Sequence, residues 1–223
     1  MCLHPFYPVR TKNTSPRRSA GRANPVKEFW EVCKMKVYEI FFSPTGGTKR
    51  VADCVSKALS ETPVMVDLTG KEPSALCLTG EDTAVLAVPS YGGRVPEPAA
   101  RRLAALQGGG ARAVLVCVYG NRAYEDTLAE MQDLAQKAGF RVTAGIAAVA
   151  EHSIARQYGT GRPDAADARQ LGEFARKIAQ KLDEGNGTVP ALQKGGRGRA
   201  GTQAHRRLQC LRRLRPGMSC RGH

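Results

Sequence analysis

Between residues 35 and 184, short continuous apolar runs alternate with stretches in which apolar residues recur every three or four positions. Runs bounded by glycine and proline predict buried strands, and the longer spacing predicts amphipathic helices. The predicted strands cover residues 37–42, 64–68, 84–89, 113–119 and 140–149. The predicted helices follow the glycine turn at residues 43–48 and then cover residues 97–106, 125–138 and 164–182.

Strands and helices alternate along this order, except for one direct connection between the second and third strands. Apolar strands that alternate with helices require a parallel sheet covered on both faces. The sequence therefore predicts a three-layer α/β domain over residues 35–184, with a doubly wound, five-stranded parallel sheet. In such sheets, ligands bind outside the carboxyl ends of the strands.

The turn between the first strand and the first helix carries the strongest chemical signal. Its hydroxyl groups and glycines belong to Ser43, Thr45, Gly46, Gly47 and Thr48. Unpaired N–H groups at a helix start, aimed by a glycine turn, bind anions, and the hydroxyl groups add donors. The pattern is neither a Walker A loop nor Gly-x-Gly-x-x-Gly. The alternative is a tight turn in which Thr48 caps the helix.

Two further loops follow the third and fourth predicted strands and also combine glycine with hydroxyl or aromatic groups. Their candidate site residues are Ser90, Tyr91, Gly92, Gly93, Tyr119, Gly120, Asn121 and Tyr124. This combination suits a flat polar ring with a phosphate tail, because tyrosines stack on ring faces and glycines expose N–H groups to ring edges. The alternative for each tyrosine is ordinary packing at a strand end. We find no catalytic Ser/His/Asp or Cys/His set and no metal-ligand spacing.

The strand that ends in Ser-Pro-Thr-Gly-Gly-Thr resembles the phosphate loop of flavodoxins, and the variant Phe-Ser-Pro-Thr-Gly is most similar to the flavodoxin half of bacterial flavodoxin–ferredoxin fusion proteins. The resemblance implies a flavodoxin-like sheet of order 2-1-3-4-5 and FMN as cofactor. It also implies electron transfer with redox partner proteins such as ferredoxins or reductases. In flavodoxins the second loop lies against the flavin, so Gly92 or Gly93 is expected to present either C=O or N–H to the ring. An NAD(P)H-dependent FMN quinone reductase is the alternative with the same fold.

The charge is concentrated at the two ends of the chain. The net charge of +14 and pI near 9.8 would ordinarily suggest a nucleic-acid or acidic membrane partner. Residues 1–34, however, carry +5 and residues 190–223 carry +9, which leaves the part between them neutral. We therefore expect no specific nucleic-acid surface on the folded domain. No run reaches the ~18 apolar residues of a membrane span, and the scattered cysteines fit a reducing, cytoplasmic location.

Both ends lack apolar periodicity and are expected to be disordered: residues 1–34 as an N-terminal extension and residues 185–223 as a basic tail. Because Met35 stands directly before the first strand, we expect it to be the natural start. In the tail, Leu208, Leu211, Leu214 and Met218 have the spacing of the cysteines that bind an iron–sulfur cluster in ferredoxins. The tail itself has only Cys210 and Cys220, so no cluster is expected in this chain.

A frameshift accounts for that spacing, because a CTG leucine codon followed by a base C contains the cysteine codon TGC one base later. The tail is then a frameshifted remnant of a ferredoxin domain, and sequencing the gene should show NTG codons at these leucines. Other leucine codons would contradict the hypothesis. The competing hypothesis is a true basic arm for RNA or an acidic partner, for which deletion of residues 190–223 should abolish salt-sensitive nucleic-acid binding.

Overall fold

The computed structural model describes residues 36–70, 76–184, 189–192 and 194. The predicted N-terminal extension and residues 195–223 of the predicted tail lie outside this described part. The strands are β1 (Val37–Phe41), β2 (Val64–Asp67), β3 (Thr83–Pro89), β4 (Arg112–Tyr119) and β5 (Arg141–Val149). The helices are α2 (Gly47–Leu59), α3 (Glu97–Ala104), α4 (Thr127–Lys137) and α5 (Ala165–Asp183).

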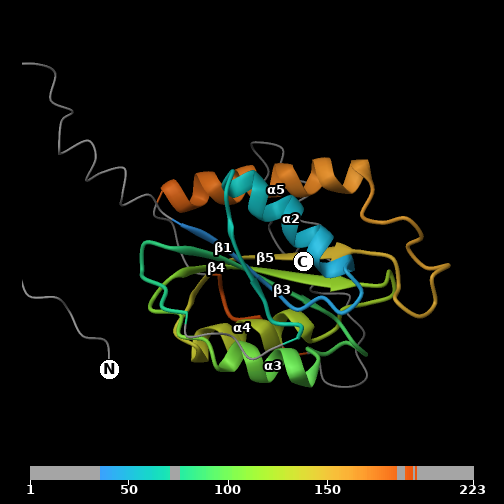
Figure 1. The fold of residues 1–223 in the computed structure, drawn as a ribbon, viewed down its shortest axis with the longest axis horizontal. Coiled ribbons are helices and arrows are strands. Elements are labelled where there is room, and N and C mark those ends of the chain that lie inside the picture. The colour runs from blue at the N-terminus through green and yellow to red at the C-terminus, as the bar shows by residue number, and fades with distance from the viewer. Residues whose placement is uncertain (1–35, 71–75, 185–188, 193, 195–223) are drawn as a thin grey trace, which may run out of the picture. The chain divides into compact units, whose positions relative to one another are not determined.

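The five strands form one parallel sheet of order β2-β1-β3-β4-β5. Helices α2 and α5 cover one face, and α3 and α4 cover the other (Figure 1). The three-layer, doubly wound architecture predicted from the apolar pattern is therefore confirmed, including the strand order.

The continuous apolar runs arise because the central strands are buried on both faces. Ile40, Leu86 and Leu115 belong to the core cluster on the α3/α4 side and are at most 1% exposed. Their neighbours Val85 and Val114 belong to the cluster on the α2/α5 side and are fully buried. A strand with solvent on one face would alternate with polar residues instead.

Helix ends differ from the predicted ends by one or two residues where the backbone leaves the helical region. Helix α4 was predicted from residue 125 but begins at Thr127, because Glu125 has φ 41° and so cannot belong to a right-handed helix. It ends before Gly139, whose φ of 85° is left-handed. Helix α5 begins after Asp164, whose side chain accepts the N–H groups of Ala166 and Asp167.

A short segment after α5, which we call the strap (residues 189–192), contacts the domain within the stretch that was predicted to be a disordered tail. The N–H of Val189 donates to the carbonyl of Val142 at 3.0 Å. The side chain of Gln132, only 2% exposed, accepts the N–H of Leu192 at 2.7 Å and donates to the carbonyls of Val189 and Pro190. Val189 and Leu192 also pack on the core. These apolar contacts and hydrogen bonds hold the strap on the domain.

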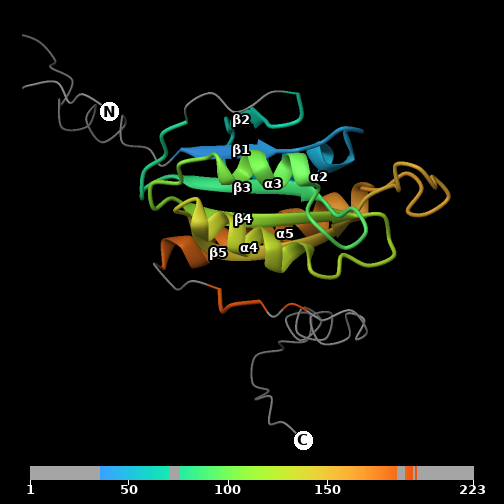
Figure 2. The same ribbon diagram turned by 90° about the horizontal axis from the view of Figure 1, so that it is seen from below.

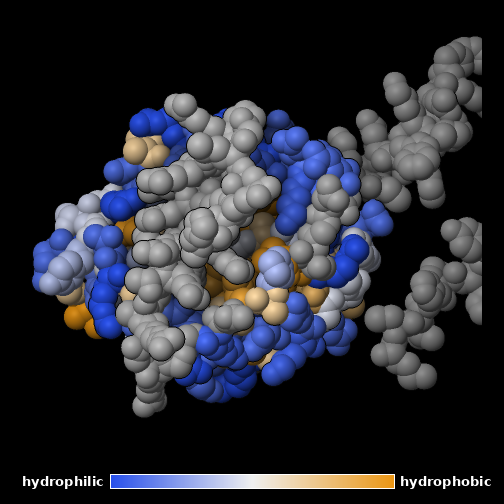
Figure 3. Space-filling model, turned by 180° about the vertical axis from the view of Figure 1, so that it is seen from behind, coloured by the Kyte–Doolittle hydropathy of each residue, from blue (hydrophilic) through white to orange (hydrophobic). Residues whose placement is uncertain are grey.

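The surface of the described part is mixed in polarity. On the side opposite to Figure 1, hydrophobic residues group in the middle with hydrophilic residues around them (Figure 3). Large exposed apolar side chains lie on the edge strand β2, at Val64 and Met65, and in the loop after β5, at Ile154 and Tyr158. Among the described residues, no helix combines the length and the apolar character needed to cross a membrane.

Glu39 is a fully buried carboxyl group in the middle of β1. Its neighbours Val37 and Phe41 belong to the α2/α5 cluster, and the Ser56 hydroxyl of α2 donates to its Oε2. Its Oε1 has no hydrogen-bond partner among the residues that the structure describes. Burial raises the pKa of Glu39, the hydrogen bond from Ser56 lowers it in part, and nearby Asp53 raises it further. The proton is therefore held more tightly in the folded protein than in the unfolded chain.

We expect Glu39→Gln to stabilise the protein at neutral pH and to have little effect near about pH 4. Because folding raises the pKa of Glu39, the contribution of this residue to stability is complete below the ordinary carboxyl pKa. That contribution falls as the pH rises through the folded-state pKa. The amide keeps an acceptor for Ser56 but has no proton to lose. Urea unfolding at a series of pH values measures the difference. Glu173→Gln, at an exposed position of α5, is the control, and an equal profile for the two variants would contradict this account.

Candidate functional site

The loops that follow β1, β3, β4 and β5 all lie at one edge of the sheet, where the strands end (Figure 2). Three of them were predicted to form the site. The fourth loop, residues 150–164, was not among them, because His152 after the fifth strand was interpreted as a surface residue. Parallel pairing brings the four loops together, since every parallel strand ends on the same side.

The turn after β1 is fixed by its own side chains and by the loop after β2. The N–H of Ser43 donates to Thr69 Oγ1 at 2.8 Å, and Ser43 Oγ accepts the N–H of Lys49 at 3.0 Å. Gly46 precedes the helix with φ 80°, a conformation that favours glycine. The turn therefore reverses directly into the first turn of α2.

Three N–H groups of this turn, those of Thr45, Gly47 and Thr48, have no hydrogen-bond partner in the described part of the chain. Thr45 is exposed, whereas Gly47 and Thr48 are buried at the helix start. The N-cap is Gly46, without a side-chain cap, so the alternative in which Thr48 caps the helix is wrong. N–H groups of this kind at the positive end of a 13-residue helix have the chemistry to bind an anion.

The basic side chains beside the turn, Lys49 and Arg50, differ in whether they already have an acidic partner among the described residues. Lys49 is already paired with Asp53, 2.8 Å away on the next turn of α2. Arg50 is exposed, and its guanidinium reaches the carbonyl of Arg162 at 3.3 Å. The donors of the candidate site are therefore mainly backbone N–H groups, with one nearby exposed cation.

The loop after β3 contains a tight turn in which Tyr91 and Arg94 exchange both backbone hydrogen bonds, at 3.0 and 3.2 Å. Its two central residues, Gly92 and Gly93, have φ of 57° and 79°. Glycine adopts left-handed φ at both central positions with little strain, whereas a residue with a Cβ atom would be strained there. Tyr91 stands beside the turn with 46% of its surface exposed, so its ring is available to a ligand.

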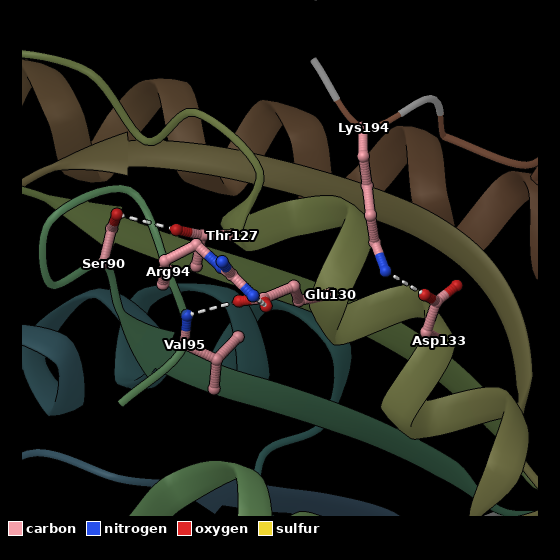
Figure 4. A network of polar contacts seen from close by, with 7 residues as sticks. All are labelled: Ser90, Arg94, Val95, Thr127, Glu130, Asp133 and Lys194. Atoms are coloured by element: carbon pink, nitrogen blue, oxygen red, sulfur yellow. Dashed lines mark hydrogen bonds and ion pairs between the residues drawn. The ribbon is translucent and has the colours of Figure 1, made fainter. Parts of the chain in front are cut away.

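Helix α4 holds this loop at several points (Figure 4). Ser90 and Thr127 join their hydroxyl groups at 2.7 Å, and the carboxylate of Glu130 accepts from Arg94 and from the N–H of Val95. Burial alone would raise the pKa of Glu130, but the hydrogen bonds from Arg94 and Val95 outweigh it and lower the pKa. Sequence reasoning missed Glu130 and Thr127, because in the sequence they are ordinary polar positions of an amphipathic helix.

The loop after β4 brings the remaining predicted residues to the same edge. Asn121 is exposed with φ 65°. The rings of Tyr119 and Tyr124 pack against each other with centroids 5.4 Å apart. Tyr124 is only 8% exposed and belongs to the core cluster, which favours the packing alternative for this ring. Tyr119 is half-buried and remains the candidate for contact with a ligand.

Gly120 is required by the fourth loop. A Cβ atom at Gly120 would lie 2.8 Å from Cγ of His152. The ring of His152 in turn accepts the N–H groups of Ile154 and Ala155 on Nδ1, at 3.2 and 3.1 Å. His152 therefore organises its own loop and packs it on the site, a role that a single histidine after a strand does not reveal in the sequence.

No protein-family model matches the chain, and no curated protein matches it. Among solved structures, a flavodoxin, WrbA-like protein from Agrobacterium tumefaciens has 14% identity and a TM-score of 0.51, covering 69% of this chain and 100% of that one. A flavodoxin from the domain Archaea has 14% identity and a TM-score of 0.46, covering 67% and 99%. A flavodoxin of Streptococcus pneumonia TIGR4 has 20% identity and a TM-score of 0.43, covering 65% and 98%. The fold is flavodoxin-like.

We expect Gly93→Ala to destabilise the protein more than Gly92→Ala. Alanine at either position adopts left-handed φ, at a cost of about 1 kcal/mol. At Gly93 its Cβ would also lie 2.7 Å from Cβ of Glu125, whereas at Gly92 no atom of the described residues lies within 4 Å. The clash should add ~1–3 kcal/mol, measurable by urea unfolding. Equal losses for the two variants would show that the loop moves freely away from Glu125.

Proposed function

We propose that this domain binds FMN at the carboxyl edge of its sheet and works as a cytoplasmic electron-transfer flavoprotein. The observation that carries the proposal is the turn at Thr45, Gly47 and Thr48, where three N–H groups at a helix start have no partner among the described residues. The flavodoxin-like fold places the two other candidate loops at the same edge (Figure 2). A phosphate with an attached aromatic ring fits this combination of donors and loops.

The residues of the turn suit a phosphomonoester. Its oxygens accept from backbone N–H groups, which need no counter-charge to hold a dianion at a helix start. The hydroxyl groups of Thr45 and Thr48 are further donors, and the left-handed Gly46 lets the backbone approach closely. Ser43 supports the turn from inside, because its hydroxyl already accepts the N–H of Lys49.

The ring of the cofactor would lie between the loops after β3 and β4. Tyr91 is exposed and Tyr119 is half-buried, so both offer aromatic surface for stacking. The turn Gly92–Gly93 supplies backbone groups to the edge of the ring, and Asn121 adds an exposed amide. When bound, FMN supplies one- and two-electron chemistry. The protein residues orient it, limit its contact with water and tune its potential.

A site built from backbone amides, hydroxyl groups and tyrosines supports the function of an electron carrier. Its partners would be redox proteins such as ferredoxins or reductases. The alternative, an NAD(P)H-dependent FMN quinone reductase, predicts steady-state oxidation of NAD(P)H with a quinone. An electron carrier takes part in such turnover only when a separate reductase is present.

We expect the purified protein to be yellow or to take up added FMN, and Thr45→Glu to weaken FMN binding by about tenfold or more. Thr45 is exposed, so the new carboxylate faces solvent and repels the phosphate without disturbing the core. Flavin fluorescence quenching measures the affinity for FMN of the unchanged protein and of Thr45→Glu. Riboflavin, which lacks the phosphate, should bind the variant and the unchanged protein alike.

Thr62→Glu is the matched control, because Thr62 is also exposed but lies in the connection between α2 and β2. It should leave the affinity for FMN unchanged. A protein that is colourless and takes up no FMN would overturn the proposed function. An equal loss of riboflavin binding in Thr45→Glu would overturn the assignment of the turn to the phosphate.

A further inference from the structure

In the loop after β3, hydrogen bonds hold four of the five peptide groups between Ser90 and Val95. Tyr91 and Arg94 bind each other through both backbone groups, and the carbonyl of Gly93 accepts the N–H of Asp126 at 3.1 Å. The N–H of Ser90 donates to the carbonyl of Val118 at 2.7 Å. Within the described residues, the peptide between Gly92 and Gly93 has neither its C=O nor its N–H bonded. This peptide can therefore rotate without breaking any hydrogen bond of the loop.

Glu130 provides the strongest of the contacts that hold the loop. It lies in α4, and its side chain is 16% exposed. Its Oε1 accepts from Arg94 Nε at 2.7 Å and also from Nη2, while its Oε2 accepts the N–H of Val95 at 2.8 Å. One carboxylate thus binds a side chain and a backbone group of two consecutive loop residues. Charge-assisted hydrogen bonds of this kind are about twice as strong as neutral ones.

The other contacts come from the same end of α4. Ser90 and Thr127 join their hydroxyl groups at 2.7 Å, and Asp126 holds the carbonyl of Gly93. The loop is therefore fixed at its start by Thr127, at its centre by the backbone of Asp126 and at its end by Glu130. Figure 4 shows the first and last of these contacts on one face of the helix.

We propose that Glu130 is a positioning residue for the flavin site: by binding Arg94 and the N–H of Val95, it fixes the loop to α4 so that only the peptide Gly92–Gly93 is free to reorient. The inference rests on the proposed FMN function. It adds a specific role for a residue that need not touch the cofactor. A loop anchored at both ends presents the glycine peptide at a constant place, which lowers the entropy lost when a ligand binds.

A carboxylate is needed at this position because it accepts three donors and carries the charge opposite to that of Arg94. Glutamine in its place has one acceptor oxygen and would direct an NH₂ group to the guanidinium or to the N–H of Val95. Glu130→Gln therefore keeps the size of the side chain while removing one of its two attachments. The loop should remain folded but less constrained.

The experiment compares Glu130→Gln with Asp133→Asn in the full chain. Asp133 lies on the same helix and forms an ion pair with Lys194, so its change to asparagine removes an equal charge without touching the loop. In flavin-free protein, hydrogen exchange should be at least about tenfold faster at the amides of Arg94 and Val95 in Glu130→Gln. Asp133→Asn should leave these amides unchanged.

The second readout uses FMN. Glu130→Gln should weaken FMN binding by about tenfold and change the ratio of affinities for oxidised and reduced FMN, seen as a shifted midpoint potential. A tenfold change in that ratio for one electron corresponds to about 59 mV. Asp133→Asn should give the affinity and the potential of the unchanged protein.

The outcomes separate the two proposals. If the unchanged protein binds no FMN, the proposed function fails, while hydrogen exchange still tests the attachment of the loop. If Glu130→Gln matches Asp133→Asn in exchange, affinity and potential, the role of Glu130 is overturned. Should Glu130→Gln fail to fold, Arg94→Met replaces it, because the Arg94 side chain is 64% exposed. Arg94→Met should change exchange, FMN affinity and potential in the same direction but less. If it changes none of them, the positioning role of Glu130 is likewise overturned.

Discussion

Burial of both faces of β1, β3 and β4 is the constraint on which the rest of the structure depends. Ile40, Leu86 and Leu115 face one helical layer, and Val85 and Val114 face the other. Apolar strands of this kind need a layer of helices over each face, so the chain returns through a helix after β1, β3 and β4, and the strands run parallel. Parallel strands end on one side, and this collects the glycine-rich loops at a single edge.

The loops at that edge are held by different means. The turn after β1 is fixed locally, by the hydroxyl group of Ser43 and the left-handed Gly46. At the start of α2 it leaves N–H groups that no described residue accepts. The loop after β3 depends on α4, through Thr127 and Glu130. Free donors in one loop and a fixed frame in the other suit a ligand with an anionic end and a flat ring.

Helix α4 connects the site with the far end of the domain. Its first turns hold the loop after β3, and its middle, at Gln132 and Asp133, binds the strap and Lys194. The side chain of Gln132 is buried with both of its polar atoms bonded, as buried amides require. The same helix thus holds both the strap and the glycine turn after β3.

Much of the site was open to prediction from the sequence because it is local. The glycine turn at residues 43–48 precedes a helical pattern directly, and the loops after β3 and β4 follow apolar runs, so their place at one edge follows from the sheet. Glu39 was not predictable as a special residue, because its hydrogen-bond partner Ser56 lies 17 positions away on α2. Glu130, 35 positions from Val95, was missed for the same reason.

The sequence by itself determined the elements, their parallel arrangement and the turns that need glycine, because each of these depends on residues close together in the chain. Only the tertiary structure decided which polar side chains meet: Glu130 with Val95, His152 against Gly120, and Gln132 with the strap. It also decided that Tyr124 packs into the core while Tyr91 stays exposed. Such choices depend on how the helices settle on the sheet, and no local pattern of residues specifies that packing.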